Sequence, residues 1–186
     1  MVIVFTDRRQ ARRPITEVIA AAVDGGARLV VMREKDLPDA ERAALAVRLQ
    51  TVLAAAGGRL LLAGRIAGPD GQHLAAGDPW PVSATGLVGR SCHNAEELSA
   101  AAAEGAAYAT LSPVFPSASK PGYGPPLGIS RLREACAAVP LPVYALGGID
   151  SPERARLCRE AGAAGVAVMG AVMRADDPAR VVEDLS

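Results

Sequence analysis

Histidine is the residue type best suited to proton transfer near neutral pH, and this 186-residue chain contains two. His93 follows a Gly-Arg-Ser-Cys run at 89–92 and directly precedes Asn94, a residue type that often begins a helix. A neutral imidazole at such a junction can act as a general acid or base, although a capping or surface histidine is the alternative. His73 lies inside an expected strand, where a core or supporting role is favoured.

Basic side chains follow two further expected strands. Arg33 and Lys35 stand in a Met-Arg-Glu-Lys-Asp run at 32–36, and Arg65 follows the leucine-rich run at 60–63. Basic groups at the ends of strands can hold an anionic ligand through charge-assisted hydrogen bonds. The alternative for residues 33–36 is a solvated charge cluster at the start of the next helix.

The longest expected loop, at 113–126, combines proline and glycine with hydroxyl and amino groups. Ser117, Ser119 and Lys120 lie in this loop. Long loops at the mouth of a barrel often close over a ligand, so this loop is predicted to act as a lid or ligand clamp. A plain connecting segment is the alternative.

Two segments with small residues follow the last two expected strands. Gly148 belongs to a Gly-Gly pair, and Met169 with Gly170 follows an apolar run. Exposed backbone N–H groups in such segments, especially at the start of a helix, attract phosphate. We therefore predict phosphate binding at Gly148, Met169 and Gly170.

Alternating strands and helices are needed to bring these residues together. Three times an Ala-rich stretch is followed by Gly-Ala and a short apolar run, a pattern typical of helices alternating with buried parallel strands. The pattern predicts a single compact (β/α)₈ barrel over residues 1–186 with some shortened helices; an open doubly wound sheet is the alternative. The expected strands are 2–6, 28–33, 59–63, 72–75, 87–91, 107–112, 142–146 and 165–169, and the expected helices are 14–24, 38–56, 95–104, 129–138, 152–161 and 178–185.

Composition excludes several classes of partner. Lys and Arg number 20 and Asp and Glu number 20, so no basic surplus supports nucleic-acid binding. No stretch approaches the roughly 20 apolar residues that span a bilayer, and no signal peptide is apparent, so a cytoplasmic protein is expected. The three cysteines have no metal-site or disulfide spacing, and the Ala-rich composition is compatible with a homodimer.

Several of these motifs together resemble the superfamily of thiamine phosphate synthases and thiazole tautomerases. The matching stretches are 33–36, 89–93, 113–116, 120–124, 127–128, 147–149 and 165–169, which follow one another in order along nearly the whole chain. The resemblance implies a (β/α)₈ barrel and a phosphorylated thiazole or pyrimidine ligand.

The synthase branch joins hydroxymethylpyrimidine pyrophosphate to thiazole phosphate and needs magnesium. Its third strand usually ends in Asn-Asp-Arg, whereas this chain has Ala63, Gly64 and Arg65 there. Asp78 matches a second magnesium carboxylate of that branch. One carboxylate is a poor site for a hard cation, so we expect neither metal nor cofactor.

The tautomerase branch resembles the chain more closely at 89–93, where it carries Gly-Arg-Ser-x-His. The resemblance gives His93 the proton shuttle that aromatises a thiazole carboxylate phosphate, with Arg33 and Lys35 facing this anionic substrate. Gly148, Met169 and Gly170 are then the phosphate contacts. The resemblance also implies that the lid makes its contact with substrate through Ser117, Ser119 and Lys120. The sequence thus predicts a thiazole tautomerase, with a synthase or a non-catalytic regulatory barrel as alternatives.

Overall fold

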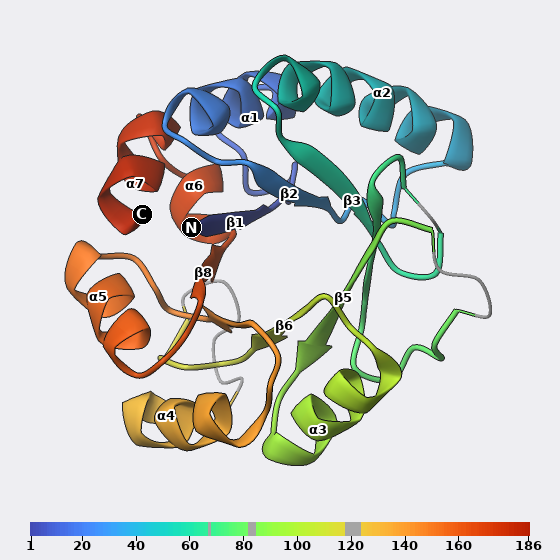
Figure 1. The fold of residues 1–186 in the computed structure, drawn as a ribbon. Coiled ribbons are helices and arrows are strands. Elements are labelled where there is room, and N and C mark those ends of the chain that lie inside the picture. The colour runs from blue at the N-terminus through green and yellow to red at the C-terminus, as the bar shows by residue number, and fades with distance from the viewer. Residues whose placement is uncertain (67, 82–84, 118–123) are drawn as a thin grey trace.

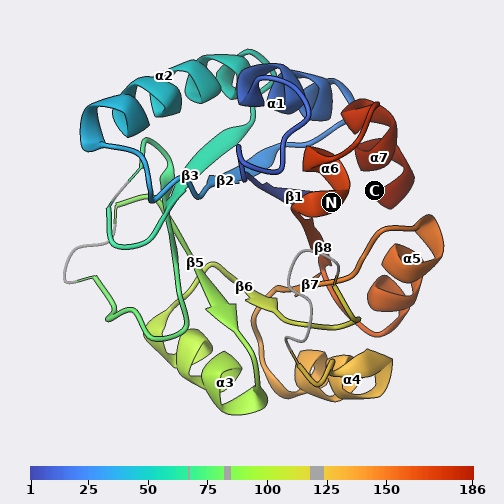
Figure 2. The ribbon, with the colours of Figure 1, turned by 180° about the vertical axis from the view of Figure 1, so that it is seen from behind.

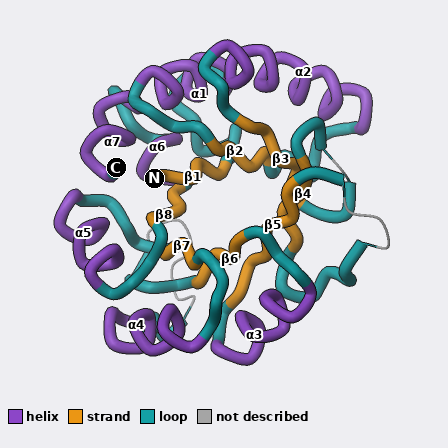
Figure 3. The backbone as a smooth tube through the Cα atoms, in the orientation of Figure 1, coloured by secondary structure: helices purple, strands orange, loops and turns teal. Residues whose placement is uncertain are grey.

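A closed parallel barrel forms the centre of the protein in a computed structural model, which describes residues 1–66, 68–81, 85–117 and 124–186. Each strand in this described part pairs with the next in sequence, and the last pairs with the first, placing Ile3 beside Ala167 (Figure 3). This closure confirms the predicted barrel over the open sheet. The strands are β1 (Val2–Phe5), β2 (Leu29–Met32), β3 (Arg59–Ala63), β4 (Gly71–Leu74), β5 (Leu87–Cys92), β6 (Tyr108–Leu111), β7 (Val143–Leu146) and β8 (Gly165–Val168).

Helices surround the barrel on the outside, as the ribbon shows from both sides (Figures 1 and 2). Within the described residues no helix lies between β3 and β5, as the short spacing of those strands predicts. The short α6 directly after β8 was not predicted. The helices are α1 (Ile15–Asp24), α2 (Asp39–Ala55), α3 (Ala95–Glu104), α4 (Gly128–Ala138), α5 (Pro152–Glu160), α6 (Gly170–Met173) and α7 (Pro178–Leu185).

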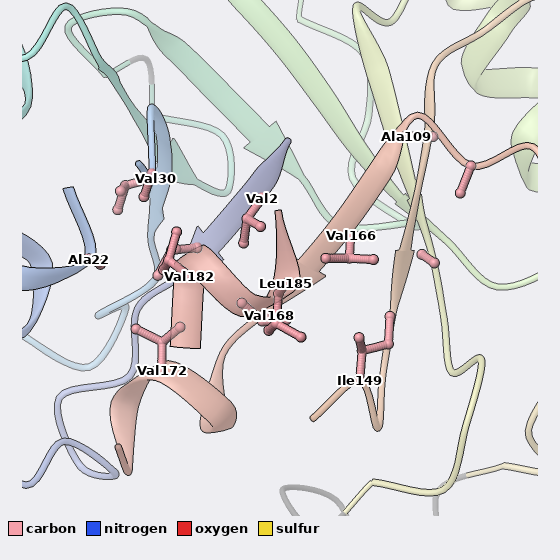
Figure 4. Close-up of a cluster of buried hydrophobic side chains, with 14 of the residues drawn as sticks. Val2, Ala22, Val30, Ala109, Ile149, Val166, Val168, Val172, Val182 and Leu185 are labelled. Atoms are coloured by element: carbon pink, nitrogen blue, oxygen red, sulfur yellow. The ribbon is translucent and has the colours of Figure 1, made fainter. Parts of the chain in front are cut away.

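Apolar side chains pack in two layers because successive residues of a strand point to opposite faces. One layer fills the space between strands and helices, where Val2 and Val166 lie near Val182 and Leu185 of α7 (Figure 4). The other fills the barrel itself and consists of Ile3, Phe5, Leu29, Val31, Leu61, Ala63, Tyr108, Tyr144 and Ala167. Strands covered on both faces explain the continuous apolar runs in the sequence.

Side-chain caps fix two of the helices that follow the mouth of the barrel. Asn94 accepts a hydrogen bond from the Glu97 N–H at 2.8 Å, and Ser151 accepts one from the Arg154 N–H at 3.3 Å. Both caps lie where the sequence predicts a helix start. In the part of the chain that the structure describes, every helix is too short or too polar to cross a membrane.

Candidate active site

A cavity of about 580 Å³ opens at the carboxyl ends of the strands. This is the end at which barrel enzymes carry their active sites, because the variable loops after the strands meet there. The cavity draws on all parts of the barrel. Its polar lining residues are Thr6, Asp7, Arg8, Arg9, Arg33, Glu34, Lys35, Asp36, His73, Ser91, His93, Ser112, Ser117, Asp150 and Arg174.

A buried carboxylate organises the β1–β2 side of the cavity. Glu34 is 4% exposed, and its carboxylate accepts hydrogen bonds from the Thr6 hydroxyl and, at 3.0 Å, from the Arg8 N–H. The Thr6 oxygen in turn accepts from the Arg33 N–H at 2.9 Å. These hydrogen bonds connect the loop after β1 to the loop after β2. The backbone that carries the basic side chains of both loops is therefore held in place.

The basic side chains on these two loops differ in their partners. Arg8 and Arg9 both bind the carboxylate of Asp36, Arg9 at 2.9 Å. The guanidinium of Arg33 donates to the sulfur of Met169, which carries no charge. Lys35 is exposed, and among the described residues no carboxylate lies within 4.0 Å of its ammonium group. Neither Arg33 nor Lys35 is neutralised by a carboxylate of the described residues, and their predicted contact with an anionic ligand stays a prediction.

The adjoining part of the mouth, after β7 and β8, presents backbone groups to the cavity, since β8 pairs with β1. Gly148, Met169 and Gly170 all line the cavity, which agrees with their predicted place. The carbonyl of Gly148 accepts from Arg154 Nη1 at 2.7 Å, which holds the loop in place. At the start of α6, the N–H groups of Gly170 and Ala171 have no acceptor within the helix. Phosphate binding by this segment stays a prediction.

His93 lines the cavity at the end of β5 and is half-buried. Its Nδ1 lies 2.9 Å from the carbonyl oxygen of Ser112, and since a carbonyl can only accept, Nδ1 carries the proton. The backbone N–H of His93 donates to Glu97 at 2.7 Å. The contact of Nδ1 orients the ring, so in the neutral imidazole Nε2 is the nitrogen without a proton, and the contact with Glu97 fixes the backbone of His93.

His73 also lines the cavity, although the sequence placed only His93 at the active end. It is buried in β4, with Nδ1 2.9 Å from the Tyr108 hydroxyl and Nε2 2.9 Å from the Ser91 hydroxyl. Burial, followed by the charges of Lys35 and Arg33, lowers the pKa of His73 to about 3. The ring is therefore neutral at physiological pH. Strand alternation, which points odd-numbered residues of this strand inward, was the signal for its position.

Other predicted residues have mixed outcomes. Ser117 lines the cavity, whereas Ser119 and Lys120 lie outside the described residues. Arg65 is exposed and is absent from the described residues that line the cavity, so its predicted substrate contact has no support in the structure. Asp78 is likewise absent from that lining, and its carboxylate accepts from the Ala75 N–H at 2.8 Å.

Sequence reasoning missed the contribution of the loop after β1. Thr6, Arg8 and the buried Glu34 hold the charged side of the mouth together. The signal was available, because Thr-Asp-Arg-Arg at 6–9 directly follows an apolar strand and must lie at the mouth of a barrel.

Comparison with known proteins bears on the choice between the branches. The sequence profile described as thiamine monophosphate synthase matches residues 2–172. A putative thiamine-phosphate synthase of Geobacter sulfurreducens is 40% identical over 94% of this chain and 87% of its own length. The thiamine-phosphate synthase of Roseiflexus castenholzii is 37% identical over 96% and 83%. Among solved structures, thiamine phosphate pyrophosphorylase from Pyrococcus furiosus superposes with a TM-score of 0.86 at 29% identity, covering 99% of this chain and 92% of that one.

These relatives correct the predicted activity. The Gly-Arg-Ser-Cys-His run at 89–93 and the missing acidic residue at Gly64 predicted a tautomerase, which is an isomerase. The similar proteins are instead named as synthases, which are transferases. The tautomerase prediction is therefore wrong. The proton shuttle that this prediction assigned to His93 has no reaction to serve in a synthase. By the match over residues 2–172, the chain belongs to the thiamine monophosphate synthase family.

Proposed function

We propose that this protein is a thiamine-phosphate synthase, a transferase that joins hydroxymethylpyrimidine pyrophosphate to thiazole phosphate and releases pyrophosphate. One structural observation carries the proposal beyond the family match. The cavity is lined by the cationic groups of Arg33 and Lys35 after β2 and by glycine-rich backbone at Gly148 and Gly170 after β7 and β8. A reaction between two phosphorylated molecules needs two anion sites facing one volume, and these two segments are the candidates that support the proposal.

The reaction requires charge stabilisation more than proton transfer. The carbon–oxygen bond between the pyrimidine methylene and the pyrophosphate breaks, and its electron pair leaves on the pyrophosphate oxygen. The thiazole nitrogen supplies the pair for the new carbon–nitrogen bond. No proton moves in this step, so groups that stabilise the leaving anion matter most.

The chain's own residues divide these tasks by their position. Arg33 and Lys35, on the loop after β2, face the pyrophosphate of the first substrate. The loop with Gly148 and the start of α6 at Gly170 face the phosphate of the second. The two sites hold the reacting carbon and nitrogen together, which removes much of the entropic part of the barrier.

The direct test incubates the purified protein with both substrates and measures thiamine phosphate and released pyrophosphate. We expect both products in equal amounts, and no pyrophosphate when thiazole phosphate is omitted. The matched control is Arg48→Gln, which removes an exposed cation from α2, away from the cavity. If neither product forms with or without added magnesium, the protein is not a synthase.

A further inference from the structure

The end of the Lys35 side chain lies on the side of Gly64 where a side chain would project. A Cβ atom added at Gly64 would be 3.3 Å from Cε and 3.4 Å from Nζ of Lys35. The end of the Lys35 side chain therefore reaches the space into which a side chain at position 64 would begin to project. By the resemblance described from the sequence, this is the position at which the synthase branch usually carries a magnesium-binding aspartate.

The carboxylates around the cavity do not form a magnesium site. Position 64 has no side chain, and Asp78 lies outside the described cavity lining while its carboxylate caps the N–H of Ala75. Within the described ranges, no three acidic, histidine or cysteine side chains are grouped together, and no pair of free carboxylates faces the cavity for magnesium to share with a substrate phosphate. The carboxylates that line the cavity already accept hydrogen bonds from protein groups, and they are Asp7, Glu34, Asp36 and Asp150.

The charge of Lys35 is directed at the cavity. The ammonium has no described carboxylate within ion-pair distance, unlike Arg8 and Arg9, which share Asp36. The positive charges of Lys35 and Arg33 also help to lower the pKa of His73, which lies in the cavity wall. Two cationic groups thus act on the same volume from the loop after β2.

We infer that Lys35, assisted by Arg33, takes the place of the divalent cation and stabilises the pyrophosphate without metal. This inference rests on the proposed synthase function. As the carbon–oxygen bond breaks, the leaving pyrophosphate gains one negative charge, and the Lys35 N–H groups donate to its oxygens. The step needs no further reactant, because the electron pair stays on the leaving group.

Binding of inorganic pyrophosphate in EDTA tests the anion site without turnover. In titration calorimetry, the wild-type protein should bind pyrophosphate in EDTA, and Lys35→Gln should bind at least about 10-fold more weakly. Lys35→Arg keeps the charge and should stay within about 3-fold of wild type. The control Arg48→Gln should bind as wild type does. Wild-type binding that appears only after magnesium is added, or a Lys35→Gln protein that binds normally, overturns the inference.

A pair of variants at position 64 tests the location of the ammonium. Gly64 has a φ of +99°, so Gly64→Asp and Gly64→Asn both strain the backbone, and only the aspartate adds charge. The aspartate should pair with Lys35 and weaken pyrophosphate binding in EDTA at least about 10-fold relative to the asparagine variant. Equal affinities for the two variants would show that the Lys35 ammonium does not face residue 64 in solution.

Turnover separates this inference from the proposed function. We expect thiamine phosphate formation in EDTA within about 3-fold of the rate with magnesium. Turnover that requires magnesium leaves the synthase proposal intact and rejects the metal-free site. Pyrophosphate binding in EDTA with no product under any condition rejects the synthase and leaves the anion site standing.

Discussion

The two sides of the cavity mouth are built from different parts of the chain. One side, called the charged side here, follows β1 and β2 and consists of the side chains of Thr6, Arg33, Glu34 and Lys35. Backbone makes the side after β7 and β8, where an added Cβ at Gly148 would lie 2.2 Å from the carbonyl oxygen of Pro116. A side-chain surface can lose a charge and keep its shape, whereas the backbone at Gly148 has no room for a side chain. Substitutions on the two sides should therefore fail in different ways.

The backbone side should give the largest effect. Gly148→Ala forces a Cβ against Pro116 at a φ of +66°, so steric overlap adds to backbone strain. We expect a loss of roughly 4 kcal/mol in the free energy of unfolding, or failure to fold, measured by urea denaturation. Gly77→Ala, where an added Cβ meets nothing within 4 Å, is the matched control. If Gly148→Ala is nearly as stable as wild type, the backbone around residue 148 has room for a Cβ atom and this prediction is wrong.

Substitutions on the charged side should reduce the activity of the protein and leave its stability nearly unchanged. Arg33→Gln removes a cationic group whose side-chain partner in the structure is the uncharged Met169 sulfur. We expect kcat/KM for thiamine phosphate formation to fall about 10²-fold, with the urea midpoint close to wild type. A large loss of stability would show that the charged side is part of the structural framework.

The wall between the two sides should give a pH effect on stability. His73 has a pKa lowered to about 3 in the folded protein, against an ordinary value of 6.5, because burial disfavours its charged form. The unfolded chain therefore binds more protons between these two values, and stability falls as pH drops below 6.5. Lowering the pH from 6.5 to 5 should therefore reduce the free energy of unfolding by roughly 2 kcal/mol through His73 alone.

Variant His73→Gln isolates this contribution. Its hydrogen bonds to Tyr108 and Ser91 change, so its absolute stability differs, but the informative quantity is the slope of unfolding free energy against pH. The slope below pH 6.5 should be shallower than in wild type by up to about 1.4 kcal/mol per pH unit. An unchanged slope would mean that His73 titrates normally in the folded state.

A structural feature can be predicted from the sequence only when it leaves a local pattern of residue types. Apolar runs and glycine punctuation predicted all the barrel strands of the described part to within about two residues, because burial on both faces leaves a local trace. The contact between Thr6 and Glu34 joins residues 28 positions apart and leaves no such trace. Likewise, nothing local in the Lys35 segment indicates that its ammonium lies over Gly64.

The choice of activity failed for a related reason. The isomerase was predicted from the Gly-Arg-Ser-Cys-His run at 89–93 and from the missing carboxylate at Gly64, each taken without its neighbours in space. The structure places the end of the Lys35 side chain near Gly64, so residues 35 and 64 have to be interpreted together. A single departure from a family pattern is therefore weak evidence about chemistry until its neighbours in space are known.

His93 should show the smallest effect on activity of these residues. The proposed reaction moves no proton, so an acid–base group has no step to accelerate. His93→Gln loses a ring whose Nδ1 donates to the Ser112 carbonyl at 2.9 Å, and the ring also forms part of the cavity wall. We expect kcat to fall by less than about 10-fold, without a change in the shape of its pH profile, because the loss is one of packing and orientation. A fall of 10² or more, with the loss of a titration near neutral pH, would be the result expected of a general acid or base. That result would restore a proton-transfer role to His93. It would also show that the charged side and the backbone side are not sufficient for the reaction.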